Sequence, residues 1–82
     1  MKKIKTLEEV HKELKAAGFE FLGFRIICDC YHYYWARPLG NGKYQLAISD
    51  GWFGDYTPEF HEVTEEDLQR VKKKIREFHE WR

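Results

Sequence analysis

Residues 31–49 read YHYYWARPLGNGKYQLAIS, and this stretch decides the fold. Asn41-Gly42 is the preferred dipeptide of a two-residue type I′ turn, and aromatic and β-branched residues are frequent on either side of it. The stretch therefore predicts an antiparallel hairpin. Counting outward from the turn predicts three cross-strand pairs, which are Leu39 with Tyr44, Arg37 with Leu46, and Trp35 with Ile48.

Side chains alternate between the two faces of a strand, so the same register predicts which residues share a face. The face that we expect to form the core carries Tyr33, Trp35, Leu39, Tyr44, Leu46 and Ile48. The face that we expect to be more hydrated carries His32, Tyr34, Ala36, Gln45, Ala47 and Ser49.

The chain before this hairpin predicts a helix and one further strand. Thr6 and Glu9 form a capping box, apolar residues then recur at helical spacing, and Gly18 is placed to end the helix. Residues 19–28, FEFLGFRIIC, have the composition of a strand. No glycine or proline separates this strand from the next, so we expect the connection to turn around Asp29 and Cys30.

The chain after the hairpin predicts a loop and a second helix. Residues 49–60, SDGWFGDYTPEF, contain two glycines, a proline and two aspartates, which favours a loop. Residues 62–64 are a candidate for a short edge strand, and Thr64 followed by three acids indicates a helix start. We therefore expect one α+β domain over residues 1–82, in the order α-β-β-β-α. Its antiparallel sheet has three strands, or four if residues 62–64 pair, and both helices pack on one face.

The composition is that of a single small domain. Of the 82 residues, 43% are hydrophobic and 17% aromatic, which supplies enough apolar area for one core. Cys28 and Cys30 are too close in sequence for an unstrained disulfide, which favours a reducing compartment. No apolar run approaches the roughly 20 residues of a membrane helix, and MKKIK does not lead into a signal-peptide core. We expect a cytoplasmic protein that does not bind membranes.

Charged residues are segregated along the chain although the net charge is zero. Residues 44–67 contain seven acids and no lysine or arginine, and the flanking segments carry all 14 basic residues. Segregation of this kind indicates a partner of opposite charge. The loop combines its acids with aromatic residues, as interaction hot spots do. We expect a partner-binding surface made of Asp50, Trp52, Phe53, Asp55, Tyr56 and Glu59, joined by Tyr34 from the hydrated face of the sheet.

Thiol and imidazole side chains in the segment CDCYHYYW are of the types that bind zinc. On one straight strand Cys28 and His32 would stand ~13 Å apart, which is too far for one tetrahedral ion. A turn at residues 29–30 would remove this objection, and His61 could then be a fourth ligand beside Cys28, Cys30 and His32. We favour the metal-free interpretation, in which one thiol is packed and the other lies in a turn. A structural zinc site is the alternative.

The sequence gives less support for a nucleophilic active site or for a phosphate-binding site. A Cys–His nucleophile needs an oxyanion hole and a third orienting group, and no glycine-rich loop or paired carboxylates accompany the two cysteines. Three consecutive lysines, residues 72–74, spread around a helix and are more consistent with a solvated face than with a phosphate-binding stripe.

The order of features from Leu7 to Ser49 resembles the HicA toxins, small RNA-cleaving proteins of toxin–antitoxin systems. LEEVHKELKAAGF is similar to their first helix, and HYYWARPLGNGK is similar to their histidine-bearing strand. The resemblance implies a double-stranded-RNA-binding-like α-β-β-β-α fold. It also implies a catalytic role for His32 and an RNA partner.

Two functions are therefore expected from the sequence. The first is a non-catalytic module that presents an acidic, aromatic surface to a basic, nucleic-acid-binding protein, such as a host nuclease or effector complex. Its size and clustered acids are similar to those of phage-encoded inhibitors, the anti-CRISPR proteins among them. The second is a HicA-like protein that binds or cleaves RNA with His32. Neither function requires a cofactor, and a structural zinc is compatible with both.

Overall fold

The computed structural model describes residues 4–80, and the side chains of Trp52 and of residues 76–80 lie outside this description. Two helices flank one antiparallel sheet whose strands lie in the order β1-β2-β3-β4. The elements are α1 (Leu7–Ala16), β1 (Glu20–Ile27), β2 (Cys30–Gly40), β3 (Lys43–Ser49), a short 3-10 helix η1 (Trp52–Gly54), β4 (Glu59–Thr64) and α2 (Glu65–Glu80). This arrangement confirms the α+β class and the helix–sheet–helix order. The short edge strand is present as β4 and is longer than residues 62–64.

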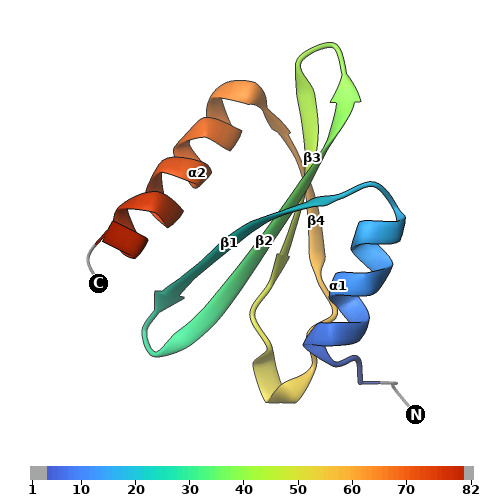
Figure 1. Ribbon diagram of the computed structural model, residues 1–82, viewed down its shortest axis with the longest axis vertical. Helices are drawn as coiled ribbons and strands as arrows, with labels where there is room; N and C mark the ends of the chain where they lie inside the picture. Colours follow the sequence, from blue (N-terminus) through green and yellow to red (C-terminus); the bar gives the residue numbers. More distant parts are fainter. Residues whose placement is uncertain (1–3, 81–82) are drawn as a thin grey trace.

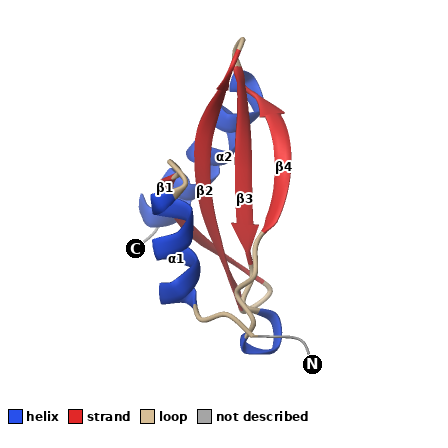
Figure 2. Ribbon diagram, turned by 90° about the vertical axis from the view of Figure 1, so that its right-hand side faces the viewer, coloured by secondary structure: helices blue, strands red, loops and turns tan. Residues whose placement is uncertain are grey.

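The two helices lie on opposite faces of the sheet, so the prediction that they share one face is wrong. Figures 1 and 2 show α1 on one side of the strands and α2 on the other. Trp35 packs with α1, whereas its neighbours Tyr34 and Ala36 pack with α2. Adjacent residues of a strand point to opposite faces, so both faces of β2 are covered. The run YYWA is continuously apolar, which is typical of a strand buried on both faces.

Each face of the sheet has its own apolar core. On the α1 side the buried residues are Val10, Leu14, Phe19, Trp35 and Ala47. On the α2 side they are Tyr34, Ala36, Leu46, Leu68 and Ile75. The sheet is therefore the middle layer of three, and the residues expected on its hydrated face are divided between these two cores and the solvent.

The register of the central hairpin differs by one residue from the predicted register. Gly40 pairs with Lys43 across the Asn41-Gly42 turn as expected, but the next pair is Pro38 with Tyr44, so Leu39 is the extra residue of a β-bulge. The bulge lies next to a proline, which has no N–H for a regular ladder. The three predicted pairs are therefore wrong, and the observed pairs include Trp35 with Ala47, Tyr34 with Ile48 and Ala36 with Leu46.

Local signals at the helix and turn positions are confirmed with small shifts. The backbone N–H of Glu9 donates to Thr6 Oγ1 (3.1 Å) and that of Thr6 donates to Glu9 Oε1 (3.0 Å), which completes the capping box. Gly18 follows α1 with φ of 94°, the left-handed conformation that glycine favours. The β1–β2 turn is formed by Cys28 and Asp29, with φ of 50° and 67°, rather than by residues 29 and 30.

Neither helix of the described chain combines the length and the apolar composition that a membrane crossing would need.

Candidate functional site

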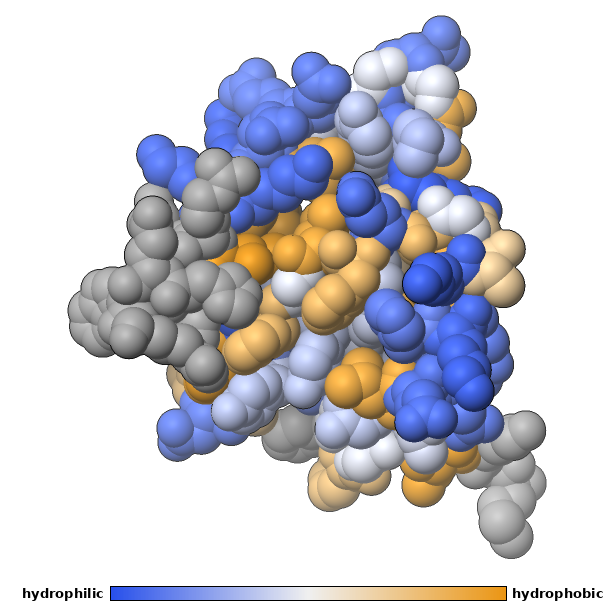
Figure 3. Space-filling model, in the orientation of Figure 1, coloured by the Kyte–Doolittle hydropathy of each residue, from blue (hydrophilic) through white to orange (hydrophobic). Residues whose placement is uncertain are grey.

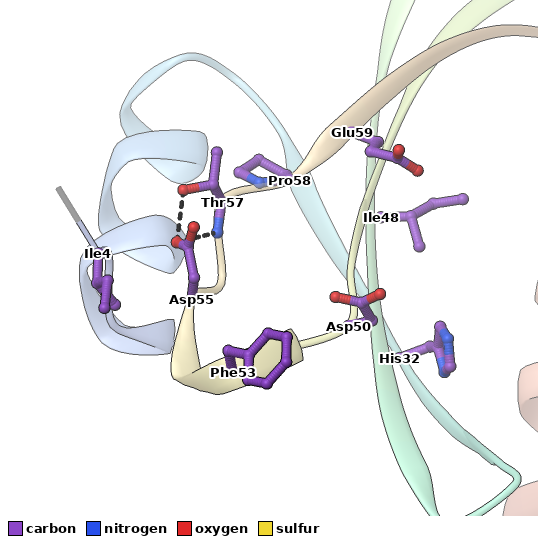
Figure 4. Close-up of a pocket in the computed structure, with 9 residues that line it drawn as sticks. All are labelled: Ile4, His32, Ile48, Asp50, Phe53, Asp55, Thr57, Pro58 and Glu59. Atoms are coloured by element: carbon purple, nitrogen blue, oxygen red, sulfur yellow. Dashed lines mark hydrogen bonds between the residues drawn. The ribbon is translucent and has the colours of Figure 1, made fainter. Parts of the chain in front are cut away.

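An open cleft of about 720 Å³ lies at the end of the sheet where residues 50–58 form the loop that connects β3 to β4. Figure 4 shows the side chains of this cleft around an open centre. Three of them are carboxylates, and apolar side chains lie between them. The lining residues are Ile4, His32, Ile48, Asp50, Phe53, Asp55, Thr57, Pro58 and Glu59.

Asp55 is a structural residue of the loop as well as part of the cleft wall. Its Oδ1 accepts hydrogen bonds from the Lys5 N–H (3.2 Å), the Thr57 N–H (3.1 Å) and Thr57 Oγ1 (2.7 Å). The Tyr56 N–H also donates to the Lys5 carbonyl (2.9 Å). These bonds join the segment before α1 to the loop, and they place Ile4 on the cleft.

Tyr56 is half-buried and faces the core of the α1 side. Its ring centroid lies 6.1 Å from that of Tyr33, and its carbonyl accepts a 2.7 Å bond from the buried Ser49 hydroxyl. Gly51, at φ of 65°, leaves room for the ring, since a Cβ there would lie 2.6 Å from Tyr56 Cε2. The sequence predicts Tyr56 as a partner contact, and the structure places it as the anchor of the loop.

Phe53 is the most exposed large apolar side chain among those described, at 86%. It lies in η1 with φ of 55°, an unfavourable conformation for a residue with a Cβ. Figure 4 shows its ring beside the open centre of the cleft. The side chain of Trp52, the other predicted aromatic anchor at this point, is outside the described part of the structure.

Asp50 and Glu59 supply the exposed carboxylates of the cleft. The Glu59 side chain is 84% exposed, and its Oε1 lies 3.9 Å from His61 Nε2. His32 is half-buried on the wall formed by β2, and its Nδ1 lies 3.3 Å from the Cys30 carbonyl. Figure 4 shows His32 next to Asp50. The histidine of the RNA-cleaving alternative therefore shares its cleft with carboxylates.

The remaining acids of residues 44–67 contact partners elsewhere in the fold. Glu62 lies 3.2 Å from the Lys43 ammonium, and Arg70 bridges Glu66 (2.6 Å) and Asp67 (3.2 Å). The Tyr44 hydroxyl donates to Glu65 (3.2 Å), and this bond raises the pKa of Tyr44 above its ordinary value. The continuous acidic segment of the sequence is therefore divided, and its cleft portion consists of Asp50, Asp55 and Glu59.

Tyr34 is only 6% exposed and packs beneath α2, so the expectation that it lies on a hydrated face is wrong. Burial raises the pKa of Tyr34, and the Arg25 guanidinium beside the hydroxyl partly offsets this rise. A partner that approaches the cleft would not reach this side chain.

The four predicted zinc ligands are not brought together. Cys28 is exposed in the β1–β2 turn, and Cys30 precedes His32 by two residues on β2. His61 pairs with Leu46 of β3, whereas Tyr33, the neighbour of His32, pairs with Ser49, which is three residues or roughly 10 Å further along β3. Across residues 4–80, no three His, Cys, Asp or Glu side chains that the structure describes form a group able to hold a metal ion.

Scans of this chain against protein-family models, curated proteins and solved structures find no match. The function proposed for this protein therefore depends on the residues of the cleft and of the surfaces around it.

Proposed function

We propose that this protein is a non-catalytic binding module whose acidic cleft receives a lysine or arginine side chain from a basic protein partner. The observation that supports this function is the convergence of Asp50, Asp55 and Glu59 on one open cleft with apolar walls. Carboxylates that share a cleft create a negative potential, which attracts positive charge and speeds association.

The walls of the cleft match the two chemical parts of a long basic side chain. Ile48 and Pro58 offer apolar surface to the methylene stem, while Asp50 and Glu59 offer oxygens to the charged head. The exposed ring of Phe53 can cover an arginine guanidinium by a cation–π contact. A bidentate bond from guanidinium to carboxylate would add directionality, so arginine is favoured over lysine.

A nucleic-acid-binding protein is the class of partner that best fits this surface. Such proteins present clustered lysine and arginine residues to phosphates, and a carboxylate-lined surface offers a similar distribution of negative charge. Binding of the module would then compete with nucleic acid, so the module would act as an inhibitor. The same charge disfavours RNA as a ligand of this cleft, because phosphates are repelled by carboxylates.

An NMR titration with a short oligoarginine peptide tests where a basic ligand binds. We expect the largest amide shifts in residues 50–59 and in His32, with an affinity that falls as salt is added. A matched titration with single-stranded RNA should leave these amides unchanged. Shifts centred on α2, or tighter binding of RNA than of the peptide, would contradict the proposal and favour the RNA-binding alternative.

A further inference from the structure

The outer edge of β1 is an open and apolar edge of the sheet. β1 is the first strand in the sheet order, and within residues 4–80 no other strand pairs with its outer side. Figure 1 looks onto this edge, and Figure 3 shows apolar side chains gathered across the middle of the same view, between the polar surfaces of the two helices. Phe21 is 43% exposed, and Tyr31 on the neighbouring strand is 45% exposed. An open apolar edge of this kind is a template for pairing with another strand.

A β-bulge determines which side chains of this edge share a face. β1 pairs Phe21 with Trp35 and then Gly23 with Tyr34, so Leu22 is the extra residue. Phe21 and Phe24 therefore both lie on the α1 face, where Phe24 stacks on Tyr31 at 5.5 Å. Glu20 and Arg25, which pair with Ala36 and His32, both lie on the α2 face.

We propose that two copies of this chain associate through their β1 edges, antiparallel to each other, in the register that places Glu20 opposite Arg25 of the second copy. The same register places Phe21 opposite Phe24 of the second copy on the other face. Two-fold symmetry repeats both pairs, so the edge is complementary to itself in charge and in aromatic surface. The product is one continuous sheet of two four-stranded halves.

The edge at the other side of the sheet lacks this complementarity. β4 carries Glu59 and Glu62 and no lysine or arginine, so two β4 edges would bring like charges together. Exposed charge of one sign is a common protection of edge strands against pairing. An apolar hollow of about 310 Å³ lies beside Phe21, lined also by Leu7, Glu8, His11, Tyr33 and Trp35, and aromatic side chains of a second copy would extend over it. The chain therefore has one edge suited to self-association and one edge protected from it.

Charge-reversal variants test the pairing and its register. We expect the mass of the wild-type protein in sedimentation equilibrium to rise with concentration from that of one 10.0 kDa chain toward that of two. In a dimer of either single variant, Glu20→Arg or Arg25→Glu, positions 20 and 25 of the two copies would carry the same charge and repel each other. Each single variant should therefore stay at the mass of one chain. An equal mixture of the two should recover the dimer, because each new charge then faces its opposite, and the Glu20→Arg/Arg25→Glu double variant should also dimerise.

The controls separate this interface from general charge effects and from the cleft. Glu66→Arg and Arg70→Glu make the same charge changes on exposed α2 and should dimerise like the wild type. Circular dichroism establishes that each variant is folded. Recovery of the dimer in the mixture would also show that both single variants keep the fold that pairing needs. A wild type that stays at one chain at every concentration would overturn the proposal. So would dimers that survive either single reversal, or a mixture that fails to recover. None of these results depends on a ligand for the cleft.

Discussion

Trp35 Nε1–H donates a hydrogen bond to His11 Nδ1 at 3.2 Å, which links the centre of the sheet to α1. Trp35 is 1% exposed, and the His11 ring also packs edge-on against Phe21 at 5.6 Å. Among the described residues His11 Nδ1 is the acceptor of this indole N–H, and a buried donor without a partner is costly. The acceptor role requires Nδ1 to be unprotonated, so this contact exists only with a neutral imidazole.

Replacement of His11 by phenylalanine should destabilise the protein although the ring remains aromatic. We expect the free energy of unfolding to fall by about 1–3 kcal/mol, because the Trp35 N–H loses its acceptor in the core. Urea denaturation measures the change. His61→Phe, on exposed β4, should change it by less than about 0.5 kcal/mol. Equal effects of the two substitutions would show that the Trp35–His11 bond contributes nothing.

Gly51→Ala should be more destabilising than Gly54→Ala. Both glycines have positive φ, 65° and 78°, so each substitution incurs the left-handed penalty of about 1–2 kcal/mol. Only at Gly51 would the new Cβ also meet the Tyr56 ring, since nothing lies within 4 Å of the corresponding position at Gly54. The difference between the melting temperatures of the two variants measures the effect of the clash with Tyr56. Equal melting temperatures would contradict the role of Tyr56 as loop anchor.

Asp55→Ala should loosen the loop, because three hydrogen bonds end on the Asp55 carboxylate. We expect a loss of about 1–2 kcal/mol in the free energy of unfolding and faster amide exchange at Lys5 and Thr57. Asp50→Asn, a change in the same loop, serves as the comparison and should have a smaller effect on exchange at these two amides. For this reason a charge reversal at Asp55 would confound loss of binding with loss of structure, and Asp50 with Glu59 is the better pair for functional tests.

Alkaline pH should destabilise the fold through Tyr34. Burial raises the pKa of the folded-state hydroxyl above the ordinary value of about 10, so the unfolded chain releases this proton first as pH rises. The stabilising effect is complete below about pH 10 and is lost as pH rises through the folded-state pKa. Urea midpoints between about pH 8 and pH 11 should fall more steeply for the wild type than for Tyr34→Phe. Parallel slopes would contradict the burial of this hydroxyl.

The parts of the fold that sequence predicts well are those that depend on neighbouring residues. The capping box of Thr6 and Glu9, the end of α1 at Gly18 and the turn at Asn41-Gly42 all need only a few adjacent residues, and all three are confirmed. The bulge at Leu39 cannot be predicted from adjacent residues in this way. A proline and a glycine beside the turn are compatible with the predicted register, in which Leu39 pairs with Tyr44, and with the observed register, in which Pro38 does. One extra residue reverses the face of every residue beyond it, and this explains why Trp35 and Ile48 do not pair.

The candidate site was predictable in composition but not in arrangement. The acidic and aromatic loop is readable in residues 50–60, and its acids do meet in one cleft with His32. The neutralisation of Glu62 by Lys43 and of Glu66 by Arg70 depends on the paired strands and the helix, which linear charge counts do not show. Likewise the inward orientation of Tyr56 depends on the space that Gly51 leaves.

The central claim, that the cleft carboxylates bind a basic partner, is tested most directly by comparing two double variants of equal charge. Asp50→Asn/Glu59→Gln removes two carboxylates from the cleft, and Glu62→Gln/Glu66→Gln removes two that lie outside it beside Lys43 and Arg70. Calorimetric titration with oligoarginine should show at least a tenfold weaker affinity for the first variant, or about 1.4 kcal/mol, and an affinity within about twofold of the wild type for the second. Equal weakening by the two variants would mean that only net charge matters, and it would contradict a binding site in the cleft.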